Sequence, residues 1–451
     1  MSARFRNVDR STPLLLPVDM RSWVPEDDLV HFVLAAVETV SLPCFRVNHR
    51  GTGSAQYPPR MMLALLIYCY ANGLFGSRRI ERATYRDIAI RYLTGDLHPD
   101  HDTICKFRRE NFAAVSEAFL QVLKLAGEME LLRVGTISVD GTKLKANASK
   151  FRSVRYDRIC ELERQLELDI AELMRQAEQA DCCDAEDGQS LPDELAHREK
   201  LRERMGEARR KLEQRAAARA EAEREDYERK LRERDKRPPN RCGAKPKPPR
   251  AEPRPEEQIN LTDEDSGIMR RSKRSEYQQA YNAQAAVDAD GSQLVLHSHV
   301  STNASDAGEL ESSVDGVTEK AGKPSAVLAD SGYVDAEVFD RLQQGGTEPY
   351  VPPSREAASK SRKYEFRPHQ AMAPKKLKDP RLIHMREKLQ TDTGRALYAR
   401  RKQTVEPVFG IIKHAMGFRQ FLLRGTAKVT GEWELVCLGY NVKRLFNLAN
   451  A

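Results

Sequence analysis

The sequence predicts an α/β domain, an all-helical N-terminal domain, and a long helical hairpin inserted into the α/β domain. Three observations indicate this organisation. Helical patterns fill the first 130 residues, short aliphatic and β-branched runs occur at 136–139 and again after residue 276, and a segment rich in Glu, Arg and Leu separates those runs. We therefore expect a helical domain at 1–130, an α/β domain formed by 131–150 and 270–451, and an insertion at 151–269.

Length and composition exclude several classes of protein. The 451 residues suffice for two or three domains with cores of their own. The longest apolar stretch, Met61–Ala71, is too short to span a bilayer, and charged residues interrupt the N-terminus where a signal peptide would be apolar. We expect a cytoplasmic protein without a membrane partner. The eight cysteines form no CxxC pair, so neither a zinc site nor a disulfide framework is predicted.

The N-terminal domain is predicted to contain a central buried helix. Pro58 and Pro59 precede the run Arg60–Ala71, which is apolar on nearly every side. Further helical patterns cover Ser77–Leu93 and Thr103–Leu132. The first of these carries five arginines, Arg78, Arg79, Arg82, Arg86 and Arg91. This helix is a candidate reader of DNA, although a solvated helix face has the same composition.

The insertion has the spacing of two packed helices. Apolar residues recur every three or four positions from Ile159 to Ala177 and again from Leu201 to Leu212, which is typical of coiled coils. Residues 182–188 are predicted to form the turn, and a second helix is expected to start near Leu191. Seven prolines within 236–258 then favour an extended linker.

The α/β domain is predicted to contain a mixed sheet of five strands. Tyr281–Asp288 and Gln293–Val300 flank a hairpin turn, and the runs Thr136–Val139, Ala326–Ala329 and Pro349–Pro352 supply the other strands. A helix is expected at 306–318, and helices return in the C-terminal third.

Three acidic residues in separate elements are candidate catalytic residues. Asp140 follows the strand Thr136–Val139 and precedes a glycine, and Asp330 follows the strand Ala326–Ala329, so both are expected at strand ends. Glu406 lies on a helix that either begins at a Thr404 cap or continues through Pro407 with a kink. Taken singly, each acid also fits a turn or a helix start.

These acids suit phosphodiester chemistry with divalent metal ions. Two Mg²⁺ ions, for which Mn²⁺ can substitute, activate the attacking oxygen and stabilise the leaving oxygen, and carboxylates are their preferred protein ligands. We expect Asp140 to bridge both metals, with Asp330 and Glu406 each completing one shell, and no organic cofactor. Between Arg355 and Lys428 there are 19 Lys or Arg against 6 Asp or Glu, which suits a phosphodiester substrate, although a solubilising surface has the same composition.

Basic and aromatic residues near Glu406 are candidate contacts to DNA. Lys413 lies two helical turns beyond Glu406 and is expected to grip a phosphate near the metals. Upstream, Tyr398, Arg401 and Lys402 are suited to backbone phosphates and base stacking.

At these residues the chain resembles the DDE transposases of bacterial insertion sequences. The resemblance is carried by Ser138–Lys143, Asn147–Ser149, Tyr281–Gln284, Ala329–Tyr333 and Thr404–Lys413, and in the N-terminal part by Tyr57–Pro59, Ser77–Glu81 and His98–Ile104. It implies a ribonuclease-H-like catalytic domain, a helical N-terminal DNA-binding domain, and a location at the bacterial nucleoid. The three metal-binding acids of the family fall on Asp140, Asp330 and Glu406.

One signature of that family is only partly matched. Many members carry a Tyr, an Arg, the catalytic Glu and a Lys at fixed steps. Lys413 stands at the required distance from Glu406, but Lys402 occupies the arginine position, while Tyr398 and Arg401 each lie one residue early. This departure leaves the roles of Tyr398 and Arg401 open.

The resemblance implies a DNA transposase that cleaves and transfers strands at the ends of a mobile element. Its partners would be double-stranded DNA and, because two ends must be joined, a second copy of the chain, with the insertion as a candidate contact surface. Two alternatives remain open. One is a catalytically silent DNA-binding repressor, and the other is a recombinase in which Tyr398 attacks DNA with help from Arg400 and His414.

Overall fold

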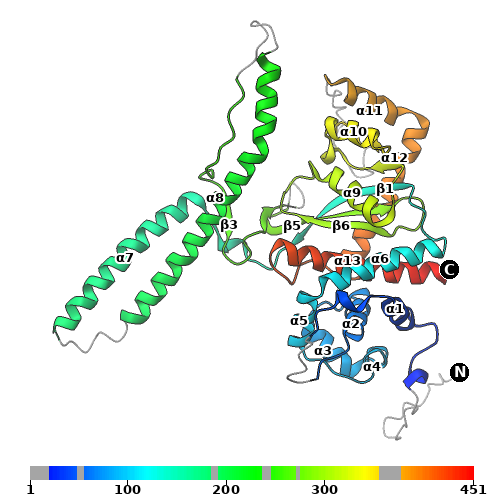
Figure 1. Ribbon diagram of the computed structural model, residues 1–451, viewed down its shortest axis with the longest axis horizontal. Coiled ribbons are helices and arrows are strands. Elements are labelled where there is room, and N and C mark those ends of the chain that lie inside the picture. Colours follow the sequence, from blue (N-terminus) through cyan, green and yellow to red (C-terminus); the bar gives the residue numbers. More distant parts are fainter. Residues whose placement is uncertain are drawn as a thin grey trace, which may run out of the picture.

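The computed structural model describes residues 20–47, 55–183, 191–235, 245–270, 275–354 and 377–450. Figure 1 shows a central sheet with helices on both faces, a layer of N-terminal helices below it, and a long helical hairpin that projects to one side. Of the turn predicted at 182–188, residues 182 and 183 belong to the helix that precedes it, and 184–188 lie outside the described residues, as does the part of the linker at 236–244. No described helix is long and apolar enough to cross a membrane.

The main sheet has six strands rather than the expected five. Its order is β4-β5-β1-β7-β8, and β6 also pairs with β5. Strand β5 is antiparallel to each of its partners, β1, β4 and β6. Strand β7 is parallel to both β1 and β8. This mixed sheet is compatible with a ribonuclease-H-like domain. The bounds are β1 Thr136–Lys145, β4 Gly267–Met269, β5 Gln278–Asp288, β6 Val295–Ser301, β7 Ala326–Leu328 and β8 Glu348–Tyr350.

The additional strand, β4, lies in a segment that the sequence pattern assigned to the insertion. Its three residues pair with Gln278–Ala280 at the start of β5. A strand this short, Gly267–Met269, has no alternation from which it can be predicted.

Helices cover the sheet and connect it to the N-terminal layer. The C-terminal helix α13, Thr426–Ala449, is buried along most of its length and packs against β6 on one side and N-terminal helices on the other. Its Trp433 indole donates to the Gln284 carbonyl, and Asn441 bonds both backbone groups of Val295. The remaining helices of this part are α9 Glu309–Ala321, α10 Ala336–Gln344, α11 Pro380–Gln390 and α12 Asp392–Gly410.

The N-terminal layer contains the expected buried helix, α2, Pro59–Ala71. Each of the two longer helical patterns divides into two helices. Asp87 separates the first pair and caps the second helix by accepting from the Ile90 amide at 3.0 Å. The bounds are α1 Leu29–Glu38, α3 Ser77–Arg86, α4 Ile88–Thr94, α5 His101–Glu110 and α6 Phe112–Glu128. One continuous hydrophobic core includes both these helices and the sheet.

The insertion forms the predicted helical hairpin, with α7 at Tyr156–Cys183 and α8 at Leu191–Asp235. The two helices enclose a small core of their own, centred on Ile159, Leu166 and Met205. A two-stranded ladder at the base, β2 Ser153–Arg155 with β3 Gln258–Asn260, was not anticipated.

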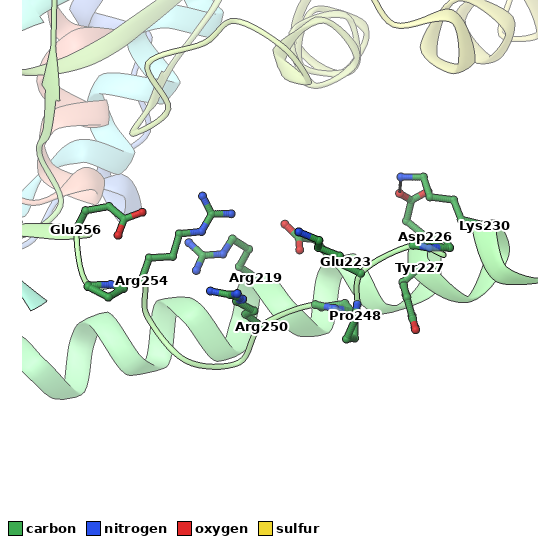
Figure 2. Close-up of a pocket in the computed structure, with 13 residues that line it drawn as sticks. Arg219, Glu223, Asp226, Tyr227, Lys230, Pro248, Arg250, Arg254 and Glu256 are labelled. Atoms are coloured by element: carbon green, nitrogen blue, oxygen red, sulfur yellow. Dashed lines mark hydrogen bonds and ion pairs between the residues drawn. The ribbon is translucent and has the colours of Figure 1, made fainter. Parts of the chain in front are cut away.

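The proline-rich segment returns along α8 and leaves a groove between the two (Figure 2). Its walls carry both basic and acidic side chains, among them Arg219, Arg250, Glu223 and Asp226. Several of these pair locally, as Asp226 does with Lys230, and the groove contains none of the predicted site residues.

Candidate active site

Asp140 lies within a strand rather than at its end. Strand β1 continues through Gly141 to Lys145, and Asp140 is paired with Ala285 of β5. On the other edge, β7 pairs only with Thr136–Ser138. The prediction of a strand end was therefore wrong, but Asp140 stands just beyond the point where the parallel partner stops.

Gly141 permits a close approach of side chains instead of turning the chain. A Cβ atom at this position would lie 2.5 Å from Asp306 Oδ1 and 2.9 Å from Asn282 Oδ1, so these side chains would have to shift. Because glycine leaves that space open, polar groups from β5 and from the segment before α9 can reach the backbone of β1 beside Asp140.

Asp330 occupies the expected position at the end of β7. It caps a short 3₁₀ helix, Ser331–Tyr333, and its Oδ1 accepts the Gly332 amide at 2.7 Å. Similarly, the Gly141 amide donates to Asp140 Oδ1 at 2.8 Å. In each aspartate a backbone amide therefore bonds Oδ1, and Oδ2 is the oxygen nearer to Arg401.

Glu406 lies inside α12, which continues through Pro407, so the Thr404 cap is not formed. Thr391 caps the helix instead. Proline has no amide hydrogen, and the helix therefore loses the bond that would end on the Gln403 carbonyl. The Gln293 side chain donates to that carbonyl at 2.8 Å and compensates for the loss. A π-helical turn, Ile411–Ala415, follows.

Arg401 brings the three acids together. Its Nη1 lies 3.2 Å from Glu406 Oε1, and its Nη2 lies 3.7 Å from Asp140 Oδ2 and 4.0 Å from Asp330 Oδ2. Because the two aspartate oxygens approach the same nitrogen, they can be no farther apart than the sum of those distances. The Arg401 side chain is only 11% exposed, whereas Glu406 is 52% exposed and Asp330 39%. The site is thus closed around Arg401 and open on the side of Glu406.

Burial is the largest influence on the pKa of Asp140, and the charge of Arg401 is the next. Burial raises the pKa of Asp140 to about 6, and the carboxylates of Asp330 and Asp306 add to that rise. Arg401 and the Gly141 amide act in the opposite direction. Burial also raises the pKa of the Tyr333 hydroxyl far above its ordinary value, with further contributions from the three aspartates. Carboxylates this close together favour a cation between them.

Asp306 is a fourth carboxylate of the site that sequence reasoning missed. It lies just before α9, and its Oδ1 accepts the side-chain amides of Asn282 at 2.8 Å and Gln284 at 2.9 Å. Gln284 is in turn bonded by the Tyr333 hydroxyl. The motif Tyr281–Gln284 had been noted in the sequence only as part of the resemblance, and these bonds indicate that its amides position Asp306.

The donor set fits a divalent cation in its chemistry. All four acids offer oxygen atoms, the ligand type that Mg²⁺ and Mn²⁺ prefer. Within the described residues, no three acidic, histidine or cysteine side chains stand close enough together to hold a metal ion as they are placed. The Arg401 guanidinium lies among them instead and provides the positive charge, so a metal ion would have to take its place.

The candidate DNA contacts around Glu406 differ in their accessibility. Lys402 is exposed, and Tyr398 is half-buried and close enough to influence the charge of Arg401. Lys413 is nearly buried, and its ammonium group donates to the Thr142 hydroxyl of β1. Lys413 is therefore bonded to β1 at Thr142, two residues after Asp140. To contact a phosphate, its ammonium group would have to give up this bond.

The residues proposed for a tyrosine recombinase are engaged elsewhere. Arg400 forms an ion pair with Asp290 at 2.8 Å, and His414 accepts from Arg419 at 3.3 Å. These contacts do not direct Arg400 or His414 toward Tyr398, so the geometry favours the carboxylate site over the tyrosine.

The arginines of the N-terminal layer are on its surface. Arg78, Arg79 and Arg82 are exposed along α3, next to Tyr85, which is 57% exposed. No carboxylate of the described chain forms an ion pair with these three arginines. Arg91, in contrast, lies on α4 and is bonded to Asp96 at 2.8 Å.

Two family models match the chain. Residues 18–110, which include α1 to α5, match a transposase domain (DUF772), and residues 356–446, which include Arg401, Glu406 and Lys413, match a transposase DDE domain. Searches of curated proteins and of solved structures found no match. Two separate transposase matches, one in each half of the chain, support a transposase role and support a DDE-type transposase of insertion sequences.

Proposed function

We propose that this transposase cleaves and transfers DNA strands at a site formed by Asp140, Asp330 and Glu406, in a domain with a ribonuclease-H-like fold. The observation that carries the proposal is the convergence of these acids, from three separate elements, on the single guanidinium of Arg401. Like charges this close destabilise a fold unless a cation offsets them, and clustered acids with a raised pKa are typical of functional sites.

The chain's own residues would bind and orient two Mg²⁺ or Mn²⁺ ions. When bound, such ions activate the attacking oxygen and stabilise the leaving oxygen of a phosphodiester. Asp140 and Asp330 each keep one oxygen fixed by a backbone amide and present the other to the centre. Glu406, which is half-exposed, would complete the site from the side on which DNA approaches.

Arg401 would act as the counter-ion of the site before metal arrives. Its positive charge offsets the repulsion among the acids, and its long side chain can move aside when a stronger cation binds. A role for Arg401 in contacting the DNA backbone, as the sequence suggested, would then begin only after that movement.

The N-terminal layer would bind the ends of the element. The exposed arginines of α3, with the neighbouring Tyr85, form a basic surface suited to phosphates. Acting on two ends requires at least two copies on DNA, and the projecting α7–α8 hairpin is a candidate contact between them (Figure 1). Deleting residues 155–255 should abolish the pairing of ends in a gel-shift assay, and unchanged pairing would remove the hairpin from this role.

The proposal is tested by strand nicking of a labelled DNA fragment from the flank of the gene. The wild-type protein should nick it with Mg²⁺ and not with EDTA, and Asp140→Asn or Glu406→Gln should abolish nicking. Tyr398→Phe should leave it intact. Nicking that persists in EDTA, or a protein–DNA adduct that survives denaturation, would instead support the tyrosine mechanism. Specific binding without nicking under any metal condition would support the silent repressor.

A further inference from the structure

A basic cleft lies where β1 ends and the chain returns after the π-helical turn. It is lined by Lys143, Leu144, Lys145, Gln278, Lys413, His414, Arg419 and Gln420, and its volume is about 350 Å³. Four of these residues carry a full positive charge, His414 adds a group that can be protonated, and none is acidic. We call these residues the β1 cleft.

Three of the cations in the β1 cleft are not neutralised. Lys145 and Arg419 are exposed and Lys143 is half-buried. Within the part of the chain that the structure describes, no carboxylate lies within ion-pair distance of these three side chains. Elsewhere on the surface, Arg209, Arg215 and Arg381 each pair with an acid. Uncompensated cations in a concave surface concentrate the positive potential there.

The cleft is held in shape by backbone contacts. The Phe421 amide donates to the Lys145 carbonyl at 2.9 Å, and the Lys145 amide donates to the Arg419 carbonyl at 3.4 Å. Arg419 Nε donates to the Lys413 carbonyl at 3.0 Å, and its Nη2 donates to His414 Nδ1 at 3.3 Å. Because Nδ1 accepts, the proton of a neutral His414 is on Nε2, and this exposed group is a further donor.

The cleft is next to the candidate active site along a strand edge. Between the end of the β7 pairing at Ser138 and the bridge of Lys145 to Gln420, that edge of β1 has no partner strand among the described residues. Lys143 and Lys145 lie three and five residues beyond Asp140, which corresponds to about 10 and 17 Å along a strand. Because these steps are odd, the two lysines leave β1 on the opposite face from Asp140, and a DNA strand that reaches both groups would pass around this unpaired edge. At about 3.4 Å of rise per nucleotide, these distances span about three to five nucleotides.

We propose that the β1 cleft binds a backbone phosphate of the DNA strand, about three to five nucleotides from the phosphate that is cleaved. The inference rests on the proposed function, since it takes Asp140 as the position of the scissile phosphate. The cleft would hold the strand in register with the acids, and its cations would contribute to affinity without reading the base sequence.

The test combines side-chain and phosphate changes. A short duplex from the flank of the gene is labelled, and binding is followed by fluorescence anisotropy in Ca²⁺ with the full-length Asp140→Asn protein, which cannot cut. Single neutral methylphosphonates are placed at successive positions on either side of the cleavage point. A methylphosphonate three to five nucleotides from the cleavage point should weaken DNA binding by the Asp140→Asn protein several-fold. In proteins that also carry Lys145→Ala or Arg419→Ala it should have no further effect.

Salt dependence gives a second readout. Each of the two added substitutions should reduce the slope of log affinity against log salt concentration by about 0.9, the contribution of one phosphate contact. Lys145→Arg should keep both the slope and the methylphosphonate effect. Lys230→Ala is the matched control, because Lys230 is exposed on α8 and already paired with Asp226. Lys145 is exposed, so Lys145→Ala should leave the melting temperature unchanged. Arg419→Ala also removes the bonds to the Lys413 carbonyl and to His414, so Lys145→Ala is the variant that separates phosphate binding from the shape of the cleft.

Three results would overturn the proposal: an unchanged salt slope in both variants, methylphosphonate effects that are the same with and without Lys145, or no binding of DNA by the parent protein. Failure of the proposed catalytic function has a different signature. In that case nicking is absent from the wild-type protein, while the salt slope and the methylphosphonate effect still depend on Lys145 and Arg419.

Discussion

Arg401 donates to Glu406 at 3.2 Å, and the other terminal nitrogen of the same guanidinium lies 3.7 Å from Asp140. A single side chain five positions before Glu406 thereby supplies the positive charge for acids on two different elements. Divalent metal ions and Arg401 would compete for the same oxygens. This competition makes the role of Arg401 measurable without any DNA.

Replacing Arg401 should make the folded state depend on metal. In Arg401→Met the acids lose their common counter-ion, so the metal-free protein should be less stable by roughly 2–4 kcal/mol. Mg²⁺ should then raise its melting temperature more than that of the wild type, because no guanidinium has to be displaced. Thermal unfolding in EDTA and in Mg²⁺ measures both effects. Arg400→Met is the control, since Arg400 is exposed and pairs with Asp290. Equal Mg²⁺ shifts in wild type and Arg401→Met would contradict the competition.

A methyl group at Gly141 should disturb the site by steric overlap. Gly141→Ala would place its Cβ 2.5 Å from Asp306 and 2.9 Å from Asn282, and relieving such overlap typically costs about 1–3 kcal/mol. Chemical denaturation would measure the loss. Gly127→Ala is a matched control in α6, where a Cβ meets nothing within 4 Å and alanine should stabilise the helix. If the two variants were equally stable, the packing around Gly141 would be looser than the structure indicates.

Asp306 should contribute to metal affinity although its sequence context does not reveal it. Asp306→Asn removes a negative charge next to Asp140 and replaces one acceptor of the Asn282 and Gln284 amides. We expect affinity for Mn²⁺ to fall at least about tenfold, the usual effect of losing a group that supports metal ligands. Calorimetric titration would show this. The exposed Asp315 on α9 provides the control, and an Asp315→Asn protein should bind as the wild type does.

The raised pKa of Asp140 predicts how the stability of the metal-free protein depends on pH. Its folded pKa of about 6 lies above its ordinary value of 3.8, so the unfolded state releases this proton more readily. The contribution of Asp140 to stability is therefore fully present below pH 3.8 and is lost as pH rises through 6. Asp140→Asn, measured in EDTA, should lose this component and should gain stability over the wild type near neutral pH. If the difference in stability between the wild type and Asp140→Asn were the same at acidic and at neutral pH, the raised pKa could not be assigned to Asp140.

The three acids could be chosen as candidates from the sequence because residue type and position relative to apolar runs are local properties. Asp330 follows a strand as expected. Asp140 does not, because β1 continues for five residues beyond it and Gly141 serves packing rather than a turn. A glycine after a strand-like run can mark the end of the strand, but it can also mark a position inside the strand where side chains from other elements pack against the backbone.

The partners of the acids depend on contacts between distant segments. Asp306 is held beside the acids by the side-chain amides of Asn282 and Gln284 on β5. Arg401 and Glu406 lie on one helix because α12 continues through Pro407, where the Gln293 side chain bonds the Gln403 carbonyl. Periodicity along the chain carries no information about either contact. The family signature also favoured Lys402, whereas Arg401 is the residue that turns toward the acids.

The most direct test is the binding of Mn²⁺ by the metal-free protein, followed by electron paramagnetic resonance, in the wild type and in Asp140→Asn, Asp330→Asn and Glu406→Gln. Asp335→Asn is the control, because Asp335 caps α10 and does not contact Arg401. The account predicts that the wild type and the control take up Mn²⁺ and that each of the three site variants loses most of that uptake. Uptake that is unchanged in Asp140→Asn and Asp330→Asn would show that these carboxylates do not share a cation, and the proposed site would be wrong.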